Sequence, residues 1–256
     1  SLLAHYTEDS VAFVSNLHSS NIQVNGGTVS LRNAAIALTG EKNYIQVREL
    51  GSLWAESTTI QAAYLQVDAS GSVSLRDVSM LGDVVCAGSL AADNFVHQGG
   101  SLTVLEGATL SLDGDSALSN LTVQSGAIAS ISGIRSLNTL TLSLGASVEI
   151  SGNDFTSLAS LVLTDVSDGS YVELGYNDWG TMDKDEIFAR LGEYAPYVTL
   201  DGITVAEWNA SRFYVNNLNT SGAGSLAYAI SQVNAYSGNL KPTIFIDAAL
   251  SGSTLN

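Results

Sequence analysis

The chain has 256 residues, of which 45% are hydrophobic and 13% are charged, and its 9 basic and 25 acidic residues give a formal net charge of −16. This length is sufficient for a large hydrophobic core. The acidity argues against binding to nucleic-acid phosphates or anionic lipid, and no apolar run approaches the roughly 18 residues of a membrane-spanning helix. We therefore expect no nucleic-acid partner and no membrane insertion by this chain.

Residues 1–20 are the first candidate unit of structure. Val11 and Phe13 alternate there with a small residue, as the inward-facing positions of a strand do. The pattern is less regular than in the residues that follow. We expect residues 1–20 to form an irregular first rung of a repeat structure.

Short apolar segments then recur between residues 21 and 175 at steps of about 20 residues. They are Ile22–Val24, Ile45–Val47, Leu65–Val67, Val84–Val85, Leu102–Val104, Leu121–Val123, Leu140–Leu142 and Leu161–Leu163. A glycine-containing turn and a second apolar pair, such as Leu110 and Leu112, follow most of them. The repeat predicts an all-β fold, a parallel and right-handed β-solenoid (β-helix) of about eight rungs over residues 21–175.

Two details of this region carry further expectations. Cys86 has no partner for an intramolecular disulfide and lies in an apolar run, so we expect a small buried side chain rather than a nucleophile. The stretch Trp54–Ala63 fits the repeat least well. We expect a longer loop or a widened rung at that point.

The pattern breaks after Gly175, and residues 176–215 are expected to form a small mixed α/β insertion. Asp183 as an N-cap, with Glu186 three residues later, and Gly192 as a C-terminal stop predict one short helix. Strands are predicted at Tyr197–Leu200, Ile203–Val205 and Phe213–Val215, the first two joined by a tight Asp201-Gly202 turn. Trp179 and Trp208 lie in this insertion, where they either close the end of the core or form a surface for a glycan or another partner.

The last 41 residues, 216–256, contain a Ser-Gly-x-Gly-Ser-Leu segment ending at Leu226, a short helical pattern, a strand at Ile244–Asp247 and a Leu-x-Gly-x-Thr turn from Leu250. This order resembles the element that opens β-helical units in large secreted bacterial surface proteins, both adhesin-like and autotransporter-passenger-like. One departure is that Ala227 and Tyr228 follow Leu226, where the family usually has a basic residue. The resemblance implies an extracellular protein of the bacterial cell surface and a capping helix.

In that family the element precedes the rungs that it caps, whereas here it comes last. We therefore expect it to begin the next solenoid block of a tandem array, or to join separate subunits head to tail. The alternative is a cap that folds back on its own rod. The residues expected to cap and couple are Leu226, Ala229, Ile230, Val233, Ile244 and Ile246.

Catalysis and metal binding have little support in the sequence. The regular rungs offer no set of converging carboxylates with basic partners, which a carbohydrate-cleaving β-helix needs. His5, His18 and His97 lack the spacing of metal ligands. Five acidic residues leave calcium as a possible cofactor, although they lack the pattern of a calcium-binding loop. They are Asp165, Asp168, Asp178, Asp183 and Asp185.

These observations predict a structural protein and not an enzyme. We expect an extracellular fibre, stalk or adhesin-like module that assembles end to end with copies of itself, with surface glycans or cell-surface components as further partners. The alternative is a carbohydrate-binding or carbohydrate-cleaving β-helix.

Overall fold

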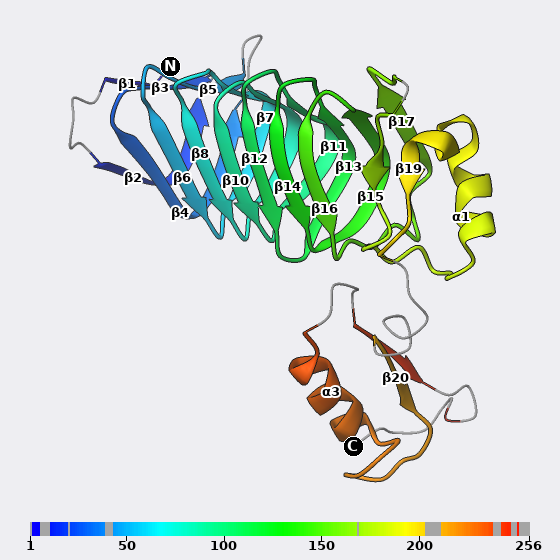
Figure 1. Ribbon diagram of the computed structural model, residues 1–256. Coiled ribbons are helices and arrows are strands. Elements are labelled where there is room, and N and C mark those ends of the chain that lie inside the picture. Colours follow the sequence, from blue (N-terminus) through cyan, green and yellow to red (C-terminus); the bar gives the residue numbers. More distant parts are fainter. Residues whose placement is uncertain are drawn as a thin grey trace.

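The computed structural model describes residues 2–5, 11–19, 21–38, 43–167, 169–202, 211–237, 242–246 and 250. Seventeen strands form one continuous parallel sheet, in which strands pair with the strand two positions along the chain and the second half of β4 pairs also with β7. The sheet winds into a β-solenoid of about seven turns (Figure 1). The fold class predicted from the repeat is confirmed, with one turn fewer than expected.

The even-numbered strands stack along one face of the rod. They are β2 (Val11–Ser19), β4 (Thr28–Leu38), β6 (Ser52–Glu56), β8 (Ser72–Arg76), β10 (Ser89–Asp93), β12 (Thr109–Asp113), β14 (Ile128–Ser132) and β16 (Ser147–Ser151). From β4 onward their central residues are in register, for example Trp54 with Ser74. We call this surface the even-strand face.

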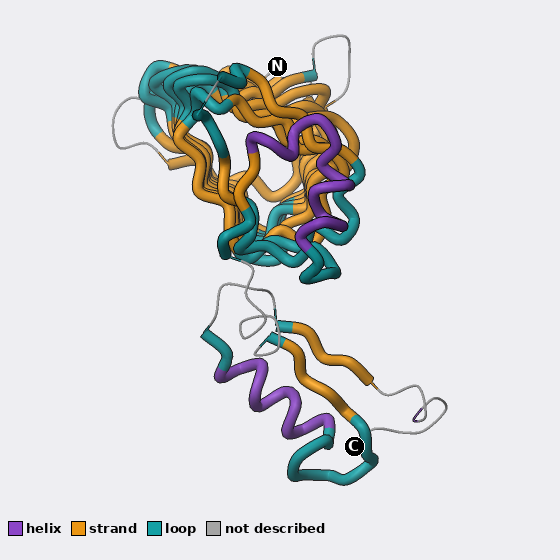
Figure 2. Tube along the Cα trace, turned by 45° about the vertical axis from the view of Figure 1, so that its right-hand side comes forward, coloured by secondary structure: helices purple, strands orange, loops and turns teal. Residues whose placement is uncertain are grey.

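The odd-numbered strands complete each turn. They are β1 (Leu2–His5), β3 (Asn21–Asn25), β5 (Tyr44–Arg48), β7 (Thr59–Val67), β9 (Ser79–Cys86), β11 (Val96–Val104), β13 (Ser116–Val123), β15 (Ile134–Ser143) and β17 (Ser160–Thr164). The longer ones bend where their register shifts, as β7 does between Gln61 and Tyr64, so that a turn has three sides. Figure 2 looks partly along the rod, and the turns lie behind one another.

The core is a stack of equivalent side chains. Leu102 pairs with Leu121, Leu121 with Leu140 and Leu140 with Leu161, so the leucines predicted to share a position stand directly above one another. Leu102, Leu121 and Leu140 are at most 1% exposed. Burial of one such leucine stabilises the fold by about 2 kcal/mol. No single turn has an interior of its own, so each depends on its neighbours.

The stretch Trp54–Ala63 and Cys86 can be compared with what the sequence predicted. The stretch Trp54–Ala63 is neither a long loop nor a widened rung: β6 and the start of β7 pair in register with the strands on either side. In β6, buried and half-buried side chains alternate as in the neighbouring strands, and Leu53 and Ala55 are fully buried. Cys86 is buried as expected, and burial raises the pKa of its thiol to about 11.

The residues after β17 close the rod. They contain β18 (Val172–Glu173), α1 (Lys184–Leu191), the 3-10 helix η1 (Gly192–Tyr197) and β19 (Val198–Thr199). The helix begins and ends as predicted, because the Asp183 carboxylate accepts the backbone N–H groups of Asp185 and Glu186 and Gly192 adopts a φ of 58°. β19 pairs in parallel with β18. Its predicted partner across the Asp201-Gly202 turn, Ile203–Val205, lies outside the described residues.

The chain ends in a separate small element, made of β20 (Arg212–Val215), α3 (Leu226–Ala235) and β21 (Thr243–Ile246). β20 and β21 form a two-stranded parallel sheet of their own, and α3 packs against both strands. The predicted helix is confirmed, with Ser225 as its N-cap. β20, which the sequence placed in the insertion, therefore belongs with the C-terminal element.

Candidate functional site: the two ends of the rod

The C-terminal end of the rod is closed by α1 and the residues before it. Ile187 and Leu191 of the helix are at most 5% exposed and join the same apolar core as the rungs. The Arg190 guanidinium donates to the backbone carbonyls of Trp179 and Phe155, each at 2.9 Å. The helix is thus fixed over the last turn by both apolar and polar contacts.

Trp179 is part of this closure. Its indole is 3% exposed, donates through Nε1 to the Leu174 carbonyl at 3.0 Å and meets the Phe155 ring edge-on, with 5.2 Å between the ring centroids. An indole in this position does not form a surface for a glycan or a partner. Trp179 therefore helps to close the end of the core, which is one of the two roles considered for it. Trp208 lies outside the described residues.

Glu173 fastens the same end by hydrogen bonds. Its carboxylate accepts the Thr199 hydroxyl at 2.6 Å and the backbone N–H groups of Asp201 at 3.0 Å and Gly175 at 2.5 Å. Burial by itself would raise the pKa of this carboxyl, but the hydrogen bonds favour the ionised form and lower the pKa below its usual value. A charged Glu173 therefore links β18 to β19.

The N-terminal end has a different character. β1 pairs with β3 and β2 pairs with β4, and no other described strand pairs with β1 or β2. Figure 1 shows these two strands at the outer end of the stack. A row of backbone N–H and C=O groups without a neighbouring strand is a template for a further strand. Within the described part of the chain, one end of the rod is closed and the other is open.

The C-terminal element is tied to the closed end by an ion pair. The Arg212 guanidinium donates to both carboxylate oxygens of Asp178, at 2.9 and 3.0 Å, and the two side chains are 3% and 9% exposed. Arg212 also lies over the ring of Phe245, 5.7 Å from its centroid. The element is held beside the rod, while its two strands stay outside the rod's sheet.

The predicted coupling residues divide into buried and exposed groups. On α3, Ala229 is 2% exposed, Leu226 and Val233 are half-buried, and Ile230 is 45% exposed. On β21, Ile244 is half-buried and Ile246 is 53% exposed. The stripe predicted for the helix therefore packs only in part on its own strands.

Aromatic residues that the sequence analysis did not select extend this apolar surface. Tyr214 of β20 and Phe245 of β21 stack with 5.5 Å between their ring centroids, and they are 64% and 42% exposed. They alternate with Phe213, Val215 and Ile244, which point to the other side of the two strands. We call Tyr214 and Phe245 the coupling surface; Ile246, although exposed, lies on the opposite side of β21, with Ile244. The sequence did predict the strand at Phe213–Val215, but it did not identify β21 as the partner of that strand.

The acidic residues considered for calcium have separate roles. Asp165 accepts the Ser143 hydroxyl, Asp178 is paired with Arg212, and Asp183 caps α1, with Asp185 in the first turn of that helix. Asp168 lies outside the described residues. No group of three or more His, Cys, Asp or Glu side chains with the geometry of a metal site occurs among the residues that the structure describes.

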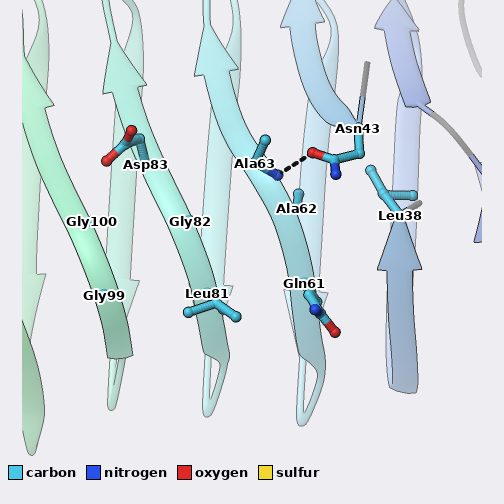
Figure 3. A pocket seen from close by; sticks show the side chains of 10 residues that line it. All are labelled: Leu38, Asn43, Gln61, Ala62, Ala63, Leu81, Gly82, Asp83, Gly99 and Gly100. Carbon is cyan, nitrogen blue, oxygen red and sulfur yellow. Dashed lines mark hydrogen bonds between the residues drawn. The ribbon is translucent and has the colours of Figure 1, made fainter. Parts of the chain in front are cut away.

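A groove of about 360 Å³ crosses the bend of the long strands (Figure 3). Its floor consists of small residues, among them Ala63, Gly82 and Gly100. Two of its polar side chains already serve the backbone, because Asn43 accepts the Ala63 N–H at 2.6 Å and Asp83 accepts the Ser101 N–H at 2.8 Å. We attribute this groove to the bend and not to a ligand.

Comparison of the chain with protein-family models, with curated proteins and with solved structures found no match. Among the described residues, no helix is long and apolar enough to cross a membrane.

Proposed function

We propose that this chain is a structural module of an extracellular bacterial fibre, stalk or adhesin-like protein, and that it joins end to end with further copies of itself. The observation that carries the proposal is the difference between the two ends of the rod. α1 covers the last turn, and the strands of the first turn have no described neighbour beyond them. The C-terminal element is attached beside the closed end by Arg212, but its two strands add no turn to their own rod.

The C-terminal element has the properties needed to cover the first turn of another copy. Its strands run parallel to one another, as all strands of the rod do. It presents the rings of Tyr214 and Phe245 to solvent, 64% and 42% exposed. Burial of this apolar surface, together with hydrogen bonds along an open strand edge, supplies the free energy of association. The same contact serves a tandem array in one chain and a polymer of separate chains.

Sedimentation velocity of the isolated chain over a range of concentrations tests the proposal. We expect self-association that increases with concentration, and a Tyr214→Ser/Phe245→Ser double variant that stays monomeric with an unchanged melting temperature. Tyr171→Ser is the matched control, because Tyr171 is 66% exposed but lies outside the C-terminal element. Association should be the same in this control as in the wild type.

Hydrogen exchange identifies which surfaces meet. Amides of β1 and β2 should gain protection as the concentration rises, and they should not do so in the double variant. A wild-type chain that remains monomeric at every concentration would contradict the proposal. Association that leaves the amides of β1 and β2 unprotected would also contradict it. Electron microscopy of native material, compared with mobility on a denaturing gel, then separates one long tandem chain from a polymer of separate chains.

A further inference from the structure

A second groove lies on the even-strand face, away from the ends of the rod. It has a volume of about 320 Å³ and runs over β6, β8, β10 and β12. Trp54 stands at one end, and the floor continues from it in register through Ser74, Ala91 and Ser111. The small floor residues leave a flat track beside one large aromatic ring. We call this the Trp54 groove.

The indole of Trp54 is held in place from one side. The Arg32 guanidinium lies 4.4 Å from the centroid of the ring, and its Nε is 3.5 Å from the Glu56 carboxylate. Arg32 belongs to β4, whereas the groove lies on the opposite side of Trp54, over β8. One face of the ring is therefore covered by a cation, and the other face lines the groove. A fixed ring loses little freedom when a ligand stacks on it.

Charged side chains follow one edge of the track. Arg76 of β8, Asp93 of β10 and Asp113 of β12 occupy equivalent positions in successive turns. The Arg76 Nε lies 3.9 Å from an Asp93 oxygen, and the two side chains are 61% and 47% exposed. Asp113 accepts the hydroxyl of Ser132 at 2.9 Å. The edge presents one guanidinium donor and two carboxylate acceptors in three successive turns.

We infer that the Trp54 groove binds a neutral oligosaccharide of pyranose units. The apolar C–H face of a sugar ring stacks on an indole, and its hydroxyl groups both donate and accept hydrogen bonds, as guanidinium and carboxylate groups require. Polar side chains of the edge and floor recur in the groove at the spacing of strands, about 4.8 Å, which is close to the rise of one sugar unit in an extended chain.

Charge selects a neutral ligand over an anionic one. Two guanidinium groups, Arg32 and Arg76, face three carboxylates, Glu56, Asp93 and Asp113, on this part of the face. The whole chain carries a formal charge of −16. A polyuronate or a sulfated glycan would be repelled by both. Binding of this kind adds surface recognition to the rod, and it does not depend on assembly at the ends.

Affinity electrophoresis in native gels tests the inference. The gels contain one soluble polysaccharide each: mixed-linkage β-glucan, xylan, galactomannan or dextran as neutral probes, and polygalacturonate as the anionic probe. The monomeric Tyr214→Ser/Phe245→Ser chain serves as the background, so that self-association does not affect mobility. We expect retardation by at least one neutral polymer and none by polygalacturonate.

Two sets of variants then locate the site. Trp54→Ala should weaken retardation at least about fivefold, and Trp54→Phe should keep part of it. Alanine is tolerated at this row of the face, since Ala91 occupies it two turns away. Arg76→Gln should weaken binding several-fold. Tyr64→Ala, which removes a partly exposed aromatic ring from β7, should leave binding unchanged.

The inference fails if no neutral polymer retards the folded background chain or if only polygalacturonate does. It also fails if Trp54→Ala and Tyr64→Ala are retarded equally. Melting temperatures of all variants show that each comparison is made between folded chains.

Discussion

Apolar residues occur along the strands of both the rod and the C-terminal element, but they are buried in the rod and partly exposed in the element. In β15, Leu140 and Leu142 are each 1% exposed. In β21, Ile246 is 53% exposed and its neighbour Phe245 is 42% exposed. β15 has a strand on either side and two further sides of the turn to face, whereas β21 has one partner strand and one short helix. Burial in this protein therefore comes from stacking and not from the sequence of a single strand.

The largest difference between the two regions should appear on truncation of apolar side chains. Phe95→Ala should lower the free energy of unfolding by about 4 kcal/mol, because the ring is completely buried between turns and a cavity remains. Ile246→Ala should change it by less than about 0.5 kcal/mol at concentrations where the chain is monomeric. Chemical denaturation followed by circular dichroism measures both. Equal effects would show that the element is as tightly packed as the rod.

The junction between the regions depends on one ion pair. Asp178→Asn should weaken attachment of the C-terminal element by about 3 kcal/mol, because Arg212 then keeps a buried charge without its carboxylate. Limited proteolysis should release the C-terminal element faster. Asp115→Asn is the control, since it breaks a half-exposed pair with Arg135 at 3.7 Å and should have no measurable effect. Unchanged cleavage in Asp178→Asn would mean that other contacts hold the element.

A buried polar network also stabilises the rod itself. Asn153 is completely buried and bonds to the backbone of Ile131, Ile134 and Ser151 and to the side chain of Asn177, at 2.8 to 3.1 Å. Asn153→Ala should cost about 2 kcal/mol, because these groups lose their partner. The exposed Asn138 is the matched control, with an expected cost below about 0.5 kcal/mol. Similar melting temperatures for the two variants would argue against this network.

The smallest expected effect is a dependence on pH. His97 is 2% exposed, and burial lowers the pKa of its imidazole, although a contact with the Gly82 carbonyl and the charge of Asp83 oppose the shift. The unfolded chain therefore takes up a proton below about pH 6.5 that the folded chain does not. Stability should fall as the pH decreases from about 7 to 5, and His97→Gln should reduce the slope. An equal slope in both proteins would assign the effect to other groups.

Much of the rod could be predicted because each turn repeats the same physical problem. Leu102, Leu121, Leu140 and Leu161 were aligned by sequence alone and stand in register in the structure. The third side of each turn was not foreseen. The bends at Gly82 and at Gly99 to Gly100 look like turns in a sequence, but here they lie inside long strands.

The contacts and surfaces considered for function were harder to predict because they depend on residues that are far apart in the chain. Arg212 and Asp178 are 34 residues apart, and neither has a local pattern that identifies the other. The sequence does not show which tryptophan is buried: Trp179 is 3% exposed, whereas Trp54 is half-buried and lines a groove. The helix α1 was the exception, since its start and stop are encoded within ten residues of sequence.

The direction of the hydrogen bonds in the rod has a mechanical consequence. The bonds between successive turns run along the axis of the stack, so a pulling force on the two ends loads one turn at a time and does not shear many turns together. Each turn that opens releases about 20 residues, which extend by roughly 60 Å. A fibre made of such modules would resist bending and compression through its packed core, and would lengthen stepwise under tension before it broke.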